Sequence, residues 1–208
     1  RLGQDLDGRL TTMARNVNQD IAAKVGKLNS LSESLGKLNR DIVQAMGLAQ
    51  GAPPNDLLDQ RDMMLKEMAA LVNVNVTSQS DGSVNVFIGN GQLIVAGAEY
   101  VELAATPNRL DGSRAEISVR KGGVLTEISS AITSGELAGI LEFREQILDP
   151  ARNSIGRLSV VIAESYNEQH NAGLDVRGAM GGDLFSRGQA VVNSAATNTG
   201  TLTVTIDP

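Results

Sequence analysis

The stretch from Asn55 to Val95, NDLLDQRDMMLKEMAALVNVNVTSQSDGSVNVFIGNGQLIV, contains a change from helical to strand periodicity that decides the fold. Up to Val72 the apolar side chains recur every three or four residues, which is typical of one face of a helix. From Asn73 apolar and polar residues alternate, and Asp81-Gly82 between two such runs is a typical hairpin turn. The sequence therefore predicts a helix that leads directly into an antiparallel sheet.

One long helix is predicted before this junction, over residues 1–50. Its apolar residues recur from Leu10 to Ile42 in steps of three and four, and most of its other side chains are polar or charged. Such a narrow apolar stripe is typical of a helix that packs in a rod of roughly two to four helices. Residues 50–54, which include a glycine and two prolines, are expected to end this helix.

A second long helix is expected from about Glu136 to Asn171, with Thr133 and Glu136 as a capping box at its start. Asp149-Pro150 interrupts it, and a proline inside a helix favours a kink or a break. The apolar stripes of the two long helices are predicted to pack against each other in antiparallel orientation. The residues expected at this packing seam are Leu28, Leu31, Leu35, Leu38 and Ile42 on the first helix, and Leu141, Leu148, Ile155, Leu158 and Ile162 on the second.

The predicted fold class is α+β, an antiparallel rod of long helices with a small antiparallel β-sheet inserted between them. Residues 1–172 are expected to form the helical rod domain, with its β-rich excursion at about 73–132. Residues 173–208 are expected to begin a second, β-rich outer domain, because Thr201–Ile206 alternates as a strand does. The strands expected in the excursion are 73–78, 83–88, 92–96, 115–120 and 124–128.

The composition restricts the possible functions. The chain has 208 residues, no cysteine, a net charge of −6 and only 2% aromatic residues, so its core is expected to be aliphatic. The lack of cysteine excludes disulfides and thiolate metal sites. An acidic chain without a Lys and Arg cluster is a poor partner for nucleic acid. No apolar run reaches membrane-spanning length, no secretory leader opens the chain, and its first and last residues indicate a fragment.

Candidate catalytic and metal-binding residues all have a structural interpretation. His170 is the only histidine, neither HExxH nor GxSxG occurs, and capping or packing at a helix end explains the residue. Asp56, Asp59 and Asp62 share one side of a helix, but they fall in its first turns, where the helix dipole favours carboxylates. The sequence therefore predicts no catalytic residue, no metal ligand and no cofactor, and a protein that is not an enzyme.

Five short motifs follow one another along the chain. The first consists of Leu57, Leu58, Asp59, Gln60, Arg61 and Asp62. The others are DGSVNVFIGNGQLIV at 81–95, FREQILDPA at 143–151, YNEQHNAGLD at 166–175 and GGDLF at 181–185. Arg61 and Arg144 lie inside two of these motifs near carboxylates and are interpreted as ion-pair or interface residues. In this order the motifs resemble the flagellar hook-associated protein 1 family, which joins hook to filament in bacterial flagella.

The resemblance implies a structural subunit of the bacterial flagellum that joins hook to filament. It implies an extracellular location, reached by flagellar type III export without a cleaved signal peptide and with an export chaperone. The implied partners are other axial proteins, namely the hook protein, the second junction protein and further copies, bound largely through segments outside this fragment. From the residues alone, the fragment is expected to be monomeric, because the second long helix covers the first within the same chain. The packed stripes are also expected to leave no second apolar face for a standing contact. The alternative is a flagellin-like filament subunit or a secreted helical adhesin.

Overall fold

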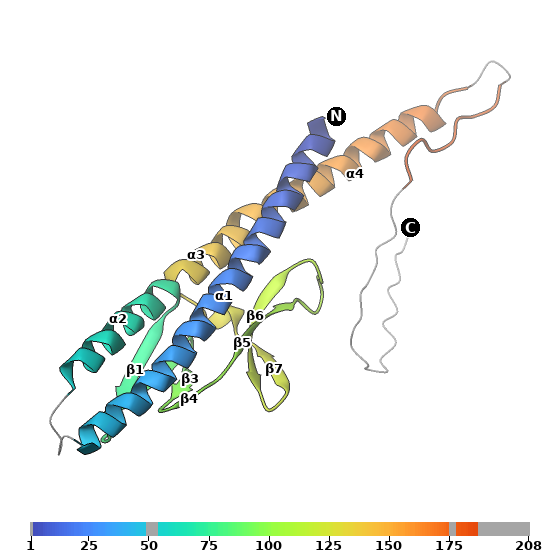
Figure 1. The fold of residues 1–208 in the computed structure, drawn as a ribbon. Coiled ribbons are helices and arrows are strands. Elements are labelled where there is room, and N and C mark those ends of the chain that lie inside the picture. The colour runs from blue at the N-terminus through green and yellow to red at the C-terminus, as the bar shows by residue number, and fades with distance from the viewer. Residues whose placement is uncertain (1, 49–53, 175–177, 187–208) are drawn as a thin grey trace.

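The computed structural model describes residues 2–48, 54–174 and 178–186 (Figure 1). Helix α1 (Leu2–Leu48) and helix α2 (Asn55–Leu71) are the two predicted helices of the first third of the chain. The carbonyl of Pro54 accepts hydrogen bonds at 3.0 and 3.1 Å from two N–H groups in the first turn of α2, which have no partner inside the helix. The strand predicted at Thr201–Ile206 and most of the predicted outer domain lie outside the described residues.

Strands of the described chain form two antiparallel sheets, one of β1, β2, β3 and β4 and the other of β5, β6 and β7. Neighbours in each sheet are also neighbours in the sequence, so hairpins connect them. The strands are β1 (Val74–Ser78), β2 (Val84–Ile88), β3 (Gln92–Ala96), β4 (Glu99–Tyr100), β5 (Leu103–Pro107), β6 (Ala115–Lys121) and β7 (Val124–Glu127).

Strands β4 and β5 are not indicated by the alternation of the sequence. β4 has two residues, and β5 reads LAATP, with two alanines and a terminal proline. Its pairing with β6, from Leu103 opposite Val119 to Pro107 opposite Ala115, makes β5 a strand. Pro107 is tolerated there because β5 is an edge strand. The excursion therefore contains two sheets where one was expected, and the predicted α+β class is confirmed.

The second long helix has three parts, α3 (Gly135–Phe143), the π-helical turn η2 (Arg144–Leu148) and α4 (Asp149–Asn171). In the π-turn the N–H of Asp149 donates to the carbonyl of Arg144, five residues back. Pro150 follows in the first turn of α4, where its missing N–H is tolerated. The discontinuity predicted at Asp149-Pro150 is thus a π-turn, and the helix continues through it without a loop.

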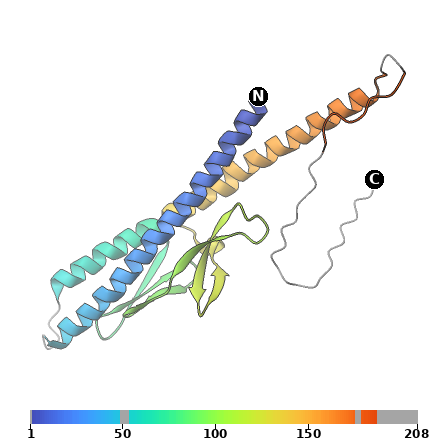
Figure 2. The same ribbon diagram turned by 45° about the vertical axis from the view of Figure 1, so that its right-hand side comes forward.

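Helices α2 and α3–α4 lie end to end along α1 and antiparallel to it (Figure 1). A second view shows the same arrangement, with the sheets against one side of α1 (Figure 2). Beyond the sheets, α4 and the N-terminal part of α1 diverge in both views. The sequence predicts that α1 packs against the second long helix alone. In the structure α2 covers the C-terminal half of α1, and the second long helix covers a shorter part of it than predicted.

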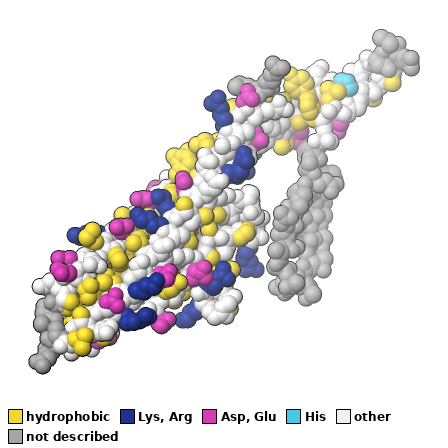
Figure 3. Space-filling view, in the orientation of Figure 1, with side chains coloured by type: hydrophobic (Ala, Val, Ile, Leu, Met, Phe, Trp, Pro, Cys, Tyr) yellow, Lys and Arg dark blue, Asp and Glu magenta, His cyan; other side chains and the backbone are white. Residues whose placement is uncertain are grey.

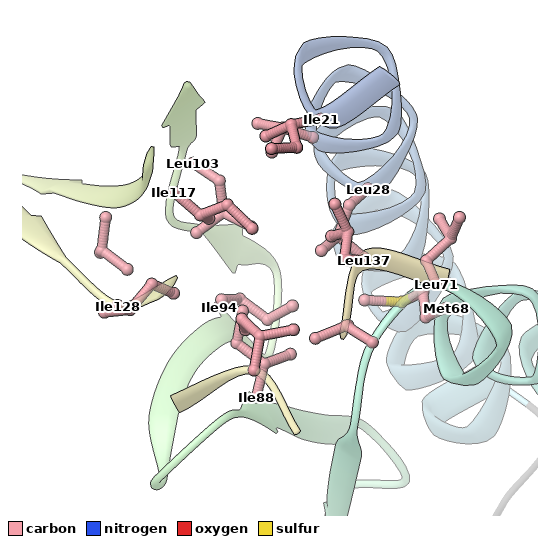
Figure 4. Close-up of a cluster of buried hydrophobic side chains, with 14 of the residues drawn as sticks. Ile21, Leu28, Met68, Leu71, Ile88, Ile94, Leu103, Ile117, Ile128 and Leu137 are labelled. Carbon is pink, nitrogen blue, oxygen red and sulfur yellow. The ribbon is translucent and has the colours of Figure 1, made fainter. Parts of the chain in front are cut away.

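The hydrophobic core lies where α1, α2, α3 and both sheets meet (Figure 4). Ile21 and Leu28 enter it from α1, Leu137 from α3, and Ile94 and Ile117 from the two sheets, and all five are fully buried. The buried hydrophobic set of the described chain contains no aromatic residue. The core is therefore aliphatic, as the composition predicts.

Gly135 allows α3 to begin directly against the end of α2. Its φ is +84°, a backbone conformation that residues with a Cβ rarely adopt. A Cβ there would lie 2.6 Å from the backbone carbon of Leu71 and 2.6 Å from the backbone nitrogen of Val72. The end-to-end arrangement of α2 and α3 therefore depends on a residue without a side chain.

The capping box predicted at Thr133 and Glu136 is wrong. Helix α3 begins at Gly135 with Ser134 as its N-cap residue, and Ser134 makes no side-chain capping hydrogen bond. Glu136 instead pairs with Lys24 of α1. The hydrogen bond from Lys24 and its positive charge lower the pKa of this carboxyl. A contact between helices thus takes the place of the local cap.

Gly36 and Gly26 offer a matched test of how closely α1 approaches the first sheet. A Cβ at Gly36 would lie 2.8 Å from the carbonyl oxygen of Ala98, whereas a Cβ at Gly26 would meet no atom within 4 Å. We expect Gly36→Ala to lower the free energy of unfolding by about 1–3 kcal/mol through overpacking. Gly26→Ala should raise it by up to about 1 kcal/mol through helix propensity. Urea unfolding measures both, and the same sign for both variants would contradict the close contact.

Candidate functional site

The predicted packing seam is buried along α1 and the first half of the second long helix, but not along α4. Leu31 and Ile155 are half-buried. Leu158 and Ile162 are 58% and 46% exposed, so their predicted burial is wrong, because α4 diverges from α1 beyond the sheets. The buried members of the seam are Leu28, Leu35, Leu38, Ile42, Leu141 and Leu148.

Helix α4 exposes further apolar side chains, among them Val161 and Tyr166, and none of its residues is buried. Hydrophobic side chains of this helix lie at the surface in the space-filling view (Figure 3). The expectation that the packed stripes leave no second apolar face is therefore wrong for α4.

Three asparagines of α1 bind the backbone of the β-region through their side chains. Asn39 is completely buried, and its Nδ2 donates to the carbonyls of Val84 and Gly97 at 2.8 and 2.7 Å. Its Oδ1 accepts a hydrogen bond from the N–H of Val84 at 3.1 Å. The amide thus takes the place that a neighbouring strand would have beside Val84.

Asn29 and Asn18 repeat this arrangement toward the N-terminus of α1. Asn29 binds the carbonyl and the N–H of Leu103 at 2.8 and 2.9 Å. Asn18 binds the carbonyl of Ser113 at 2.6 Å and the N–H of Ala115 at 3.0 Å. The three asparagines lie eleven and ten residues apart, about three helical turns each, so they share one side of α1. The spacing of the three asparagines is visible in the sequence, but the prediction of this helix rested only on its apolar residues and missed it.

A buried ion pair joins the π-turn to strand β6. The side chains of Arg144 and Glu116 are 5% and 3% exposed, and Nη2 lies 3.1 Å from Oε2. Arg144 also donates to the carbonyl of Ala115. Its Nε has no hydrogen-bond partner among the described residues. Of the two interpretations of Arg144 left open by the sequence, the structure supports the ion pair.

Arg114 extends this pair into a chain of alternating charges. Its Nε lies 2.8 Å from Oε1 of Glu116, and its Nη1 lies 2.6 Å from Oδ2 of Asp149 at the start of α4. Asn108 donates a further hydrogen bond to Glu116 at 3.1 Å. Arg144 and Asp149, one at the start of the π-turn and one just after it, are therefore both anchored to the β5–β6 hairpin.

The protonation of Glu116 follows from its partners. Burial by itself raises the pKa of this carboxyl, but hydrogen bonding to Ser129, the charge of Arg144 and the hydrogen bonds from Asn108 and Arg114 lower it by more. The pKa of Glu116 therefore lies below its usual value, and the group is ionised at neutral pH. A carboxylate held in this way stabilises the fold and is not available as a general acid or base.

The LLDQRD motif lies on α2, whose inner side faces α1. Leu57, Leu58 and Arg61 are half-buried and the other three side chains are exposed. The guanidinium of Arg61 contacts the carboxylate of Asp62 at 3.3 Å, a surface pair of little energetic weight. No group of three or more His, Cys, Asp or Glu side chains in the described chain is placed to hold a metal ion.

The YNEQHN and GGDLF motifs contact each other at the end of α4. The Oδ1 of Asn167 accepts hydrogen bonds from the N–H groups of Leu184 and Phe185, both at 2.9 Å, and its Nδ2 donates to the carbonyl of Phe185 at 2.8 Å. The rings of Tyr166 and Phe185 meet edge to face, with centroids 6.2 Å apart. Two motifs that are separate in the sequence thus form one contact.

His170 takes part in the same contact. Its Nδ1 lies 2.6 Å from the carbonyl oxygen of Gly182 and must donate, because a carbonyl has no proton. Asn171 donates to the carboxylate of Asp183 at 2.9 Å. The histidine therefore binds the backbone at a helix end, and Figure 3 shows its side chain near the far end of α4.

A cleft of about 1220 Å³ lies between the start of α1, α4 and the β5–β6 hairpin. Its lining includes Arg114 and Asp149, which are already paired with each other, and no histidine. It therefore shows no pairing of a nucleophile with a histidine base. None of the described helices combines the length and the apolar composition that a membrane span requires.

Residues 3–185 match the model of a protein family described as the flagellar hook-associated protein FlgK helical domain. Flagellar hook-associated protein 1 of Escherichia coli K12 is 36% identical over 200 residues, which cover 95% of this chain and 37% of that protein. The protein of the same name from Bacillus subtilis 168 is 26% identical over 201 residues, with 85% and 39% covered.

A solved structure, that of the flagellar hook junction protein FlgK from Burkholderia pseudomallei, is similar to this fold with a TM-score of 0.80. The sequence identity is 32%, and the match covers 90% of this chain and 34% of that one. The chain therefore spans between a third and two-fifths of the length of these relatives. Because the family model matches from residue 3 to residue 185, the chain belongs to the FlgK family of flagellar hook-associated proteins and contains its helical domain.

Proposed function

We propose that this chain is the helical domain of a structural subunit that joins hook to filament in a bacterial flagellum. The match of residues 3–185 to the FlgK helical domain carries this proposal. The physical character of the fold supports it, because Asn39, Asn29 and Asn18 fasten α1 to the β-region and Arg144 fastens the π-turn. A rod tied in this way suits a mechanical joint. Its relatives carry the name of hook-associated proteins, which favours the junction over a flagellin-like filament subunit or a helical adhesin.

The proposal includes the absence of enzymatic activity. The charged groups of the interior neutralise one another, and the only histidine binds a backbone carbonyl. Its partners would be the hook protein, the second junction protein and further copies, contacted largely through segments outside residues 1–208. Its location would be extracellular, after type III export with a chaperone and without a cleaved signal peptide.

We also propose that residues 1–172 act as one helical rod domain and that residues 173–208 begin a β-rich outer domain. The rod part would be monomeric by itself. Exposed apolar side chains are spread over several elements, and those of α4 lie on a single helix, whereas a stable complex involves roughly 20–30 residues per partner. Light scattering that shows a stable dimer at low concentration would contradict this part.

Removal of the gene tests the proposed function. Cells without it should assemble hooks that carry no filaments, and the full-length gene should restore filaments and swimming. A version that lacks the codons for residues 3–185 should fail, although it is expressed and exported to the same level as the full-length protein. Normal filaments in the cells without the gene, or in those with the shortened version, would overturn the proposal.

A further inference from the structure

We infer that the contact between residues 166–171 and 181–185, called the clasp here, fixes the last turns of α4 and the direction in which the chain leaves it. The chain reverses its direction after α4, and the clasp joins the residues before this reversal to the residues after it. His170 and Asn171 hold Gly182 and Asp183, and Asn167 holds Leu184 and Phe185. The returning segment therefore runs back along α4.

Helix α4 needs such support because it receives little from the core. Its 23 residues include none that are buried, and it extends beyond the sheets (Figure 1). A helix without tertiary packing is marginally stable in water, and its ends fray first. Phe185 packs against Tyr166 and lines the same cleft as Ile162, so the returning segment contributes apolar contact to α4.

The backbone of the returning segment is hydrogen-bonded to the residues that directly follow α4. Gly181 donates from its N–H to the carbonyl of Gly173 at 3.0 Å, and Leu174 pairs with Met180 in an antiparallel bridge. A Cβ at Gly181 would lie 2.2 Å from the carbonyl oxygen of His170, so only glycine fits there. At Gly182 a Cβ would meet no atom within 4 Å.

These positions supply two variants that open the clasp from opposite sides and two matched controls. Asn167→Ala removes three hydrogen bonds from the helix side, and Gly181→Ala forces the returning segment away. Gln169→Ala, on the same turn of α4, removes a side chain without a hydrogen bond in the described structure. Gly182→Ala keeps the backbone carbonyl that accepts from His170 and adds a methyl group where there is space.

Hydrogen exchange and spin labels in the 208-residue chain measure the two parts of the inference. The chain has no cysteine, so labels attach only at introduced Ser154→Cys and Ser186→Cys. Asn167→Ala and Gly181→Ala should reduce protection of the Leu184 and Phe185 amides, and of the last α4 turns, by about tenfold or more. The distance distribution between the labels, narrow in the parent, should broaden. Both controls should behave like the parent.

Circular dichroism and the melting temperature of the core should stay close to those of the parent, because the clasp lies far from the core. Unchanged protection in Asn167→Ala and Gly181→Ala would overturn the inference that the clasp holds α4. Lost protection with an unchanged label distance would overturn the inference that it sets the direction of the chain. An equal loss of hydrogen-exchange protection in Gln169→Ala and Gly182→Ala would overturn the inference as well, because any substitution at this end would then have the same effect.

Discussion

Arg144→Ala should lower the free energy of unfolding by about 3–5 kcal/mol, because it leaves the carboxylate of Glu116 buried without its main charge partner. The variant also releases the π-turn from the carbonyl of Ala115. Chemical denaturation at neutral pH measures the loss.

Arg120→Ala is the matched control for this substitution. Arg120 pairs with Glu102 at 3.2 Å, but both side chains are about half exposed, so its loss should cost no more than about 1 kcal/mol. The double variant Arg144→Ala with Glu116→Gln should recover part of the loss, because no net charge then remains buried. Similar effects of Arg144→Ala and Arg120→Ala would show that burial of the Glu116 pair has no energetic consequence.

The Arg144→Ala deficit should also depend on pH. In the parent the folded-state pKa of Glu116 lies below its usual value, so this group contributes stability above about pH 4.3 that is lost as the pH falls through the folded pKa. Burial raises the pKa of Glu116 and the charge of Arg144 lowers it, so the folded-state pKa of Glu116 should rise when Arg144 is removed. The difference in unfolding free energy between parent and variant should therefore narrow between pH 7 and pH 4. If the difference in unfolding free energy stays constant over this pH range, the loss of stability in Arg144→Ala comes from packing alone.

The secondary structure was predictable where local periodicity and core packing agree. The change of period between Val72 and Asn73 correctly places the end of α2 and the start of β1, because one face of each element enters the same core. Strand β5 was not predictable in this way, because pairing with β6 decides its conformation. At Glu136, likewise, a distant lysine outweighs the local capping pattern.

The polar contacts were harder to predict because they join residues that are far apart in the sequence. Glu116 interrupts the apolar segment AEISV, and a charged residue in such a segment indicates a buried charge. The segment does not indicate the partner of Glu116, because Arg144 lies on another element. The exposure of Leu158 and Ile162 was also unpredictable, because periodicity describes one face of a helix and not how far its partner extends. The family motifs, in contrast, contain Arg144, and they contain the residues of the clasp.

Asn39→Ala should lower the free energy of unfolding by about 3–6 kcal/mol. It leaves three polar groups of the backbone without partners, namely the N–H and carbonyl of Val84 and the carbonyl of Gly97, and each costs about 1–3 kcal/mol when buried and unsatisfied. Thermal or urea unfolding measures the loss. Asn16→Ala is the control, because Asn16 is exposed on the same helix and makes no side-chain hydrogen bond within the described residues.

The same substitution along α1 should produce a graded series, with the largest loss at Asn39, a smaller loss at Asn29 and the smallest at Asn18. The order follows burial, since water can reach the groups near Asn18 and replace the amide, but cannot reach those near Val84. Equal losses at the three positions would mean that the amides act through packing and not through their hydrogen bonds. A loss at Asn39 as small as that at Asn16 would mean that the strand finds other partners, and α1 would then be held to the sheet by its apolar stripe alone.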